Sequence, residues 1–345
     1  MQSRYAQVRI GKRTGRYDDH LRPSDKVNSA MRESVTRINR ILVVVDPSAT
    51  GRQAAIDKAA LLARRLNASV ELLICDIASA LDDHPLSLHR PAAPQSNTHL
   101  LDLLETLAVP LRAQGTEVKL RIIYGKSLPD SLADYIPVSK ADLVIKDTHH
   151  HSFASRTFLG NTDWHLTQIC TVPLLLTKTE PWSPSPIIMA AVDPNHANPG
   201  VSAVDREILS NAAALTGLLN GDLHVIHTFL PTAFAAVIAA GGRGTTPEYS
   251  DALRAENSYI SSQIEHLVRA YGVTPEHLHV EMGAPQGCLS DLVGKSCADV
   301  VVIGPSSHGQ WHRMIVGSTT ATILESLPCD ILIVRAGDER QTAPV

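Results

Sequence analysis

Short apolar runs recur along the chain, and polar turn residues separate them. Two of these runs, "RILVVVDPSATG" (40–51) and "PIIMAAVDPNHAN" (186–198), contain the same Val-Asp-Pro. Nearly continuous apolar runs of this length predict buried strands of a parallel sheet. Other segments, such as "AIDKAALLARRLN" (55–67), have apolar residues at i, i+3, i+4 and i+7 and predict amphipathic helices. The chain therefore alternates predicted strands and helices, which is the order of an α/β fold.

This order of elements occurs twice. Five apolar runs of the first half have counterparts in the second half, at 40–51 and 186–198, 69–77 and 222–229, 119–136 and 277–293, 140–150 and 297–307, and 172–178 and 329–335. We expect two tandem doubly wound, Rossmann-like domains with parallel sheets, at 39–180 and 185–337. The proline-rich segment "TKTEPWSPSP" (177–186) is predicted to link them.

Three segments lie outside the repeated pattern. Residues 1–38 contain nine basic and four acidic residues, which fits either a solvated, disordered tail or a basic docking arm. Residues 338–345 form a short tail. The stretch at 231–251 is first apolar and then glycine-rich, and it is expected to be a lid, a subunit contact or a loop packed on its own domain.

The composition limits which classes of partner and which cell compartment we expect. The 345 residues are 44% hydrophobic and 19% charged with a net charge of −4, which argues against a nucleic-acid partner. The apolar stretch 233–240 is far too short to span a membrane, and residues 1–20 lack the apolar core of a secretory signal. We therefore expect a soluble, cytoplasmic protein. The five cysteines form no CxxC pair and are expected to be reduced and structural.

A polar loop after one predicted strand has the features of an anion site. In "IGPSSHGQWHRMIVGST" (303–319), a strand is followed by a turn and then by Gly-Ser-Thr at the start of a predicted helix. Glycine lets the backbone approach a ligand closely, and the first turn of a helix has free N–H groups. The loop therefore predicts a site for an anion such as a nucleotide phosphate.

These features resemble the universal stress protein family. The resemblance rests on the two Val-Asp-Pro strands, a glycine after the third strand of each half (Gly125 and Gly283), and the loop 303–319. The segment "NTDWHLTQICTVPLLLTKTEPW" (161–182) is similar to the long two-domain E class. The resemblance covers residues 40–337. It implies a tandem stress-response protein whose two domains pair through their final strands as an intramolecular pseudo-dimer, either as a monomer or as a homodimer of such chains.

Nucleotide-binding members of this family share a pattern of Gly, two residues, Gly, nine residues, and Gly-Ser or Gly-Thr. Gly304 and Gly317 match the first and last glycines, whereas Ser307 replaces the second, where a side chain costs roughly 1 kcal/mol or more. The resemblance implies that ATP or a related adenine nucleotide, with or without Mg, binds in the second domain. The implied site consists of Asp193, Val225, Gly283, Gly304, Ser307, Gly317, Ser318 and Thr319.

The resemblance also implies a role for each of these residues. Asp193 would lie near the nucleoside, the backbone of Val225 would meet the base, and Gly283 would let the chain pass close by. Ser318 and Thr319 would donate hydrogen bonds to the phosphates at the helix N-terminus.

The first half departs further from the family pattern. There we align Lys146-Asp147-Thr148-His149 with Gly-x-x-Gly, and ten residues then precede Gly160. Bulky residues at the glycine positions and a shifted loop predict that no nucleotide binds in this half. Asp46 is expected to be a helix or turn cap.

Other chemistry is weakly indicated. His149, His150 and His151, with His165 and Cys75, suggest zinc, but consecutive loop residues seldom converge on one ion. The segments "YGKS" (124–127) and "VGKS" (293–296) lack the first glycine of a P-loop, and the chain contains no GxSxG. We expect no metal cofactor and no catalytic residues.

The resemblance implies a stress protein, and together with the loop pattern we expect it to bind an adenine nucleotide in its second half without dedicated catalysis. An interaction scaffold or carrier of an apolar, lipid-like ligand is the first alternative, favoured by Ser307 and by the apolar stretch 233–240. A slow ATPase is the second alternative.

Overall fold

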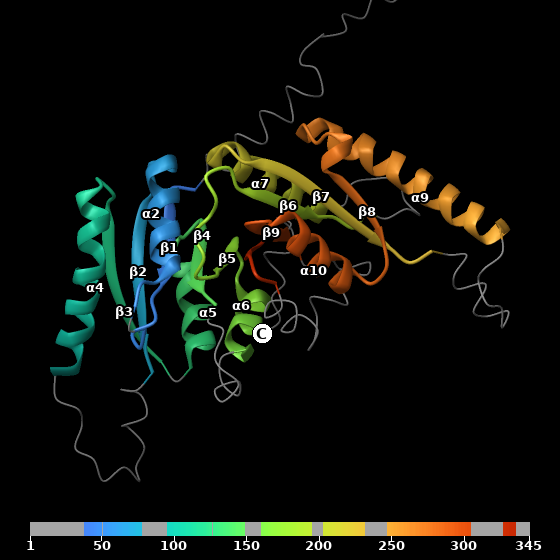
Figure 1. Cartoon of the computed structure of the whole chain (residues 1–345). Helices are drawn as coiled ribbons and strands as arrows, with labels where there is room; N and C mark the ends of the chain where they lie inside the picture. Colours follow the sequence, from blue (N-terminus) through green and yellow to red (C-terminus); the bar gives the residue numbers. More distant parts are fainter. Residues whose placement is uncertain are drawn as a thin grey trace, which may run out of the picture.

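The computed structural model describes residues 38–49, 51–77, 95–125, 127–148, 160–194, 203–231, 247–304 and 327–335. Within these ranges a single sheet of ten strands runs through the molecule, in the order β3-β2-β1-β4-β5-β10-β9-β6-β7-β8 (Figure 1). The first repeat contributes β1 (Arg40–Val44), β2 (Ser69–Asp76), β3 (Val118–Tyr124), β4 (Leu143–Asp147) and β5 (Leu174–Thr177). The second repeat contributes β6 (Ile187–Ala191), β7 (Asp222–Phe229), β8 (Leu278–Met282), β9 (Val300–Ile303) and β10 (Asp330–Ile333).

The two repeats have the same strand order and the same register. In each repeat the first strand lies between the second and the fourth, and all strands of one repeat are parallel. Ile41 pairs with Leu143 in the first repeat, and Ile188 pairs with Val300 at the equivalent position of the second. The prediction of two tandem doubly wound α/β units is confirmed.

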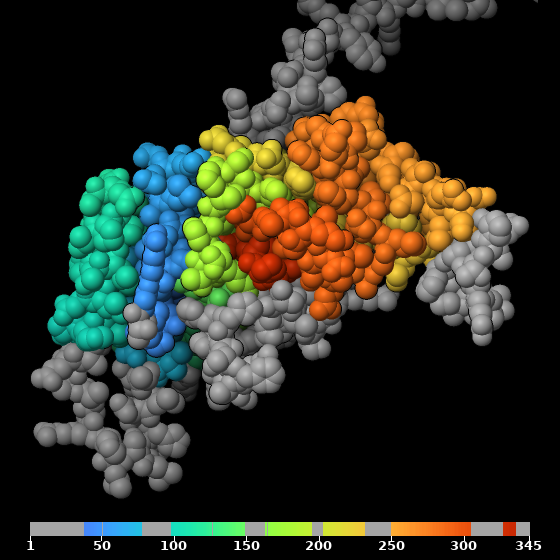
Figure 2. Space-filling model, in the orientation of Figure 1, coloured from blue at the N-terminus to red at the C-terminus, as the bar shows by residue number. Residues whose placement is uncertain are grey.

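The final strands join the repeats. β5 pairs antiparallel with β10, so that Leu174 lies opposite Ile333 and Leu176 opposite Ile331. All of these side chains are buried. Figure 2 shows the two halves as one continuous body, in which the red C-terminal segment of the second half lies beside the green of the first. Pairing of the two repeats through their last strands within one chain, which the family resemblance implies, is present in the structure.

Helices cover both faces of the sheet. One face is covered by α2 (Ala54–Leu66), α4 (Gln95–Ala113), α7 (Ala203–Leu219) and α9 (Pro247–Val268), which share a core with alternate strand residues such as Ile41 and Val43. The other face is covered by α5 (Leu128–Ser139), α6 (Gly160–Ile169) and α10 (Pro285–Ser296), packed on Leu42 and Val44. Two short 3₁₀ turns, η1 (Arg269–Tyr271) and η2 (Pro275–His277), precede β8.

The predicted helical stripe explains how α2 packs. Ile56, Ala59, Ala60 and Ala63 are all buried, and the helix ends within one residue of the predicted bounds. It ends at Asn67, whose φ of 55° lies in the left-handed region. The described residues other than glycine with positive φ all follow helices, and they form two equivalent pairs, Asn67 with Asn220 and Lys140 with Cys297. The duplication therefore extends to the backbone conformation at the helix ends.

Several smaller expectations can be compared with the structure. All five cysteines are free, and burial raises the pKa of Cys170 to about 11 and that of Cys329 to about 12, which keeps these thiols protonated. Cys297 is exposed, because it occupies the left-handed position after α10 rather than a strand.

Residues 247–251 belong to α9 and not to a loop, whereas 232–246 lie outside the described residues. No helix of the described ranges has the length and apolar character needed to cross a bilayer.

Candidate functional site

The strand order of each repeat reverses beside its first strand, where doubly wound sheets bind ligands at the carboxyl ends of their strands. In the second repeat, β6 has β7 on one side and β9 on the other. Asp193 follows β6 and Gly304 follows β9, so these two predicted residues flank the switch point of the second repeat. In the first repeat, Asp46 after β1 and Asp147 at the end of β4 flank the equivalent point.

Close packing of α7 explains why residue 304 is glycine. A Cβ atom added at Gly304 would lie 2.4 Å from Cγ1 of Val204 and 3.2 Å from Cδ1 of Ile208. The first turn of α7 therefore packs directly against the end of β9. The same turn holds the end of β6, because the buried Asp205 carboxylate accepts the Asp193 N–H at 2.9 Å. Both strand ends at this switch point are thus fixed on one helix N-terminus.

The structure does not bring Val225 to this edge of the sheet. Val225 lies in the middle of β7, fully buried, and is paired with Ala190 on one side and Leu278 on the other. Thr228, three residues later, lies at the carboxyl end of β7. Its side chain is 1% exposed, and its hydroxyl has no hydrogen-bond partner within the described part of the chain. A buried hydroxyl normally has a partner, so Thr228 is better placed than Val225 to meet a ligand.

The sequence pattern did not single out Thr228. The only available signal was a hydroxyl near the end of an otherwise apolar run, and such a residue is common in strands.

Five residues of the predicted nucleotide site remain, and the structure describes one of them, Gly283. Gly283 follows β8 with a φ of +147°, and its N–H donates to the Phe229 carbonyl at 3.0 Å. A Cβ there would lie 2.9 Å from Sγ of Cys288, so both backbone and packing require glycine. The other predicted residues, all in the loop after β9, lie outside the described residues: Ser307, Gly317, Ser318 and Thr319.

Hydrogen bonds within the first repeat connect the end of β1 to the start of α2 at its switch point. Gln53, just before α2, accepts the Asp46 N–H and donates to the Asp46 carbonyl, both at 3.0 Å. Asp46 in turn accepts the Ser48 N–H at 2.8 Å, so its carboxylate caps the turn as predicted. These hydrogen bonds hold the β1 end against α2.

The register corrects our alignment of the first repeat. Because Ile41 pairs with Leu143 as Ile188 pairs with Val300, Asp147 rather than Lys146 is the counterpart of Gly304. Twelve residues then separate Asp147 from Gly160, as twelve separate Gly304 from Gly317. The loop is therefore not shifted, and the first repeat differs at its glycine positions and not in its spacing.

The Asp147 carboxylate occupies the N-terminus of α2. One oxygen accepts the Ala55 N–H at 2.7 Å and the Thr177 hydroxyl at 2.6 Å, and the side chain is buried. The positive end of a helix is where an external anion would otherwise bind. Lys146 points elsewhere, to the Asp163 carboxylate at 2.8 Å and the Asp147 carbonyl at 2.8 Å. The first repeat thus supplies an internal anion at its own switch point.

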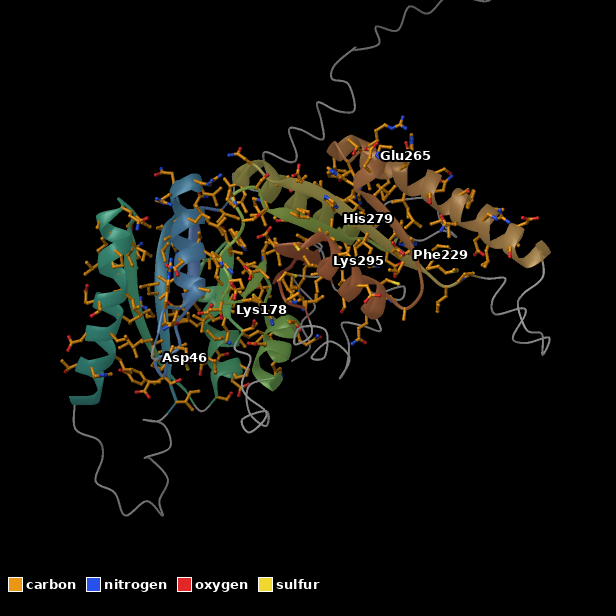
Figure 3. All side chains as sticks on the ribbon, viewed as in Figure 1. Asp46, Lys178, Phe229, Glu265, His279 and Lys295 are labelled. Atoms are coloured by element: carbon orange, nitrogen blue, oxygen red, sulfur yellow. The ribbon has the colours of Figure 1, made fainter. Side chains whose placement is uncertain are left out.

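A histidine cluster lies on β7, η2 and β8. The His224 and His277 rings stack with centroids 4.3 Å apart, and Nδ1 of His224 lies 3.0 Å from Nε2 of His279 (labelled in Figure 3). Burial and the two neighbouring imidazoles lower the pKa of His224 to about 4, while Asp222 opposes this. The pKa of His279 is also lowered, chiefly by burial, with Glu281 opposing. His224 is therefore neutral near pH 7 in the folded protein.

Stability is expected to fall below pH 6.5 because of this cluster. The unfolded chain binds a proton at His224 near pH 6.5, whereas the folded chain binds it only near pH 4. The stabilising contribution is present above pH 6.5 and is lost between these two values. After discounting for partial exposure, we expect His224→Gln to remove about 1 kcal/mol of this pH dependence. Urea unfolding at pH 7.5 and 5.0 measures the change in the free energy of unfolding between these pH values. The control is His266→Gln, at an exposed histidine. The same change in both variants would contradict the prediction.

The described residues do not support the zinc site that the histidines suggest. Among them, no group of three or more His, Cys, Asp or Glu side chains is arranged to hold a metal ion. His149, His150 and His151 lie outside the described ranges.

The chain is similar in sequence to known proteins along most of its length. The model of the universal stress protein family matches the chain twice, at residues 37–178 and 187–335. Universal stress protein E of Salmonella typhi is 22% identical over 88% of this chain and 95% of its own length. The homolog of Haemophilus influenzae is 20% identical over 87% of this chain and 98% of its own length.

Solved structures agree with the fold. The structure of the "Putative Universal Stress Protein" from Pseudomonas aeruginosa superposes with a TM-score of 0.65 at 24% identity, over 89% of this chain and 96% of its own. One from Archaeoglobus fulgidus reaches a TM-score of 0.58 at 16% identity, over 88% of this chain and 98% of its own. At these identities the likeness supports the fold alone.

Proposed function

This chain belongs to the universal stress protein family as a tandem, E-like member, and we propose that it binds an adenine nucleotide at the switch point of its second repeat. We further propose that the protein is cytoplasmic and that it binds the nucleotide without catalysing a reaction. A nucleotide would act by favouring one conformation of the protein over another, since a ligand shifts an equilibrium only through different affinities for the two states.

The observation that carries the proposal is the contrast between the two switch points. In the first repeat, the Asp147 carboxylate accepts the Ala55 N–H at the N-terminus of α2. In the second repeat the equivalent residue is Gly304, which places no side chain there. A negative charge at Asp147 repels a phosphate, whereas Gly304 does not. Of these two equivalent positions, only the one in the second repeat has the family glycine and lacks a carboxylate.

Two of the described residues would contact the nucleoside beside this glycine. Asp193 is positioned by Asp205 and would accept a hydrogen bond from a ribose hydroxyl. The buried Thr228 hydroxyl, which has no partner within the described residues, would bond to the nucleoside. The loop residues Ser307, Gly317, Ser318 and Thr319 would contact the phosphates, with Mg²⁺ offsetting their charge.

Calorimetric titration of Mg-ATP into ligand-stripped protein tests the proposal. We expect saturable binding near one site per chain and a loss of at least tenfold in affinity on Gly317→Asp, which puts a carboxylate where the phosphates would bind. The matched control is Gly160→Asp, because Gly160 is the counterpart of Gly317 in the first repeat. That substitution is expected to leave the affinity within twofold.

Two outcomes would overturn this assignment. Absence of heat at millimolar nucleotide, in protein with a native circular dichroism spectrum, would reject nucleotide binding and favour the scaffold or apolar-ligand alternative. Loss of binding on Gly160→Asp with no effect of Gly317→Asp would move the site to the first repeat.

A further inference from the structure

A pocket of about 380 Å³ lies where the two repeats meet, on the face of the sheet covered by α2 and α7. One wall is the side of α2, and the other is the segment that connects β5 to β6. The residues that flank the two switch points, Asp46, Asp147, Asp193 and Gly304, do not line this pocket. The residues used below are Arg52, Lys58, Leu61, Arg65, Thr179 and Trp182.

The connecting segment forms a fixed apolar wall. The Trp182 indole N–H donates to Oδ2 of Asp330 at 2.7 Å, which sets the position of the ring. The Lys58 ammonium lies 5.6 Å from the centroid of that ring. Ser183 is held by Asp299, which accepts its N–H at 2.7 Å and its hydroxyl at 2.9 Å. Three prolines, at 181, 184 and 186, complete a wall that is rigid before any ligand binds.

The free charge of the pocket is positive. Lys58 is neutralised by Asp330, with 2.7 Å between Nζ and Oδ2. Arg52 pairs with Asp57, but its side chain is 82% exposed, and an exposed ion pair contributes little to stability. An incoming anion could therefore take Arg52 from Asp57 at small cost. Arg65 adds a second exposed cation further along α2; its guanidinium donates to the Leu218 carbonyl, which leaves its charge uncompensated. Two exposed arginines against one carboxylate leave charge for a single anion.

We infer that this pocket binds a small aromatic monoanion, with its ring against Trp182 and the prolines and its carboxylate or sulfonate on the exposed arginines. Flat apolar groups with a few placed charges are typical of small-molecule sites, and aromatic rings favour indole faces. The half-buried Leu61 lies between the arginines along α2 and would contact the ring.

The probe for the test is 8-anilinonaphthalene-1-sulfonate, an aromatic monoanion whose fluorescence rises when it leaves water. Titration of the full chain is expected to saturate at one site. Arg52→Glu, and separately Leu61→Glu, should each weaken binding at least tenfold. Arg254→Glu is the matched control, because Arg254 is also exposed and paired with a nearby carboxylate, Asp251. It should change the affinity less than twofold.

The test is independent of the nucleotide site. Saturating Mg-ATP and Gly317→Asp should leave probe binding unchanged; displacement by ATP, or loss in Gly317→Asp, would place the probe at the second repeat and overturn the inference. Non-saturable binding, or equal binding by Arg52→Glu and Arg254→Glu, would also overturn it. If Leu61→Glu does not fold, Arg52→Glu decides, because Arg52 is exposed and precedes the helix.

Discussion

Asp330→Asn is expected to destabilise the protein by about 3 kcal/mol, because it leaves Lys58 buried without a counter-charge. Asp330 accepts Lys58 Nζ at 2.9 Å and the Lys178 N–H at 2.7 Å on one oxygen, and the Trp182 indole on the other. The Lys58 and Asp330 side chains are only 6% and 2% exposed. Burial raises the pKa of Asp330 while Lys58 opposes the rise, so the cost of removing this carboxylate from water exceeds what Lys58 returns.

Asparagine keeps one oxygen for the Lys178 N–H but turns its NH2 group toward the Trp182 indole N–H, so the loss combines the missing charge with one lost hydrogen bond. Adding Lys58→Met should recover at least half of it. Urea unfolding followed by circular dichroism measures each free energy. The control is Asp251→Ala, which breaks the exposed pair with Arg254 and should cost less than 1 kcal/mol. A similar small cost for Asp330→Asn would show that Lys58 finds water or another partner.

Gly304→Ala should cost about 1–3 kcal/mol, the usual range for overpacking a core. The new methyl group would lie 2.4 Å from Cγ1 of Val204 and 3.1 Å from the Val334 carbonyl. The helix must therefore move away from the strand end, and the Asp205 contact with the Asp193 N–H moves with it. Thermal unfolding measures the loss.

Two variants make this result interpretable. Gly287→Ala, in α10, meets nothing within 4 Å and should stabilise the protein by up to 1 kcal/mol, as expected for glycine replaced within a helix. Val204→Ala should rescue part of the Gly304→Ala defect. Equal stability of Gly304→Ala and the wild type would mean that α7 is not held against β9.

Periodicity alone predicted most of the fold. The runs of apolar residues gave all ten strands in their repeated order, and the spacing of Ile56, Ala59, Ala60 and Ala63 gave α2 to within one residue. These patterns succeed because each strand or helix must bury one face, and that requirement is local.

The site was harder to predict because its details depend on contacts distant in sequence. Lys58 and Asp330 are 272 residues apart, and Lys58 looks like a solvated residue of an amphipathic helix. The equivalence of Asp147 and Gly304 became visible only through strand pairing. Val225 and Thr228 belong to the same apolar run, and the sequence does not show where that strand reaches the sheet edge.

The antiparallel pairing of β5 with β10 changes how this assembly responds to dilution. Two separate chains joined through such strands would dissociate at low concentration, whereas two halves of one chain meet by a unimolecular step. Each half is thus always supplied with the same partner. The first half therefore completes the sheet that supports the second half whatever residue follows its own strands, and Asp147 can stand where its counterpart has Gly304 without weakening that support.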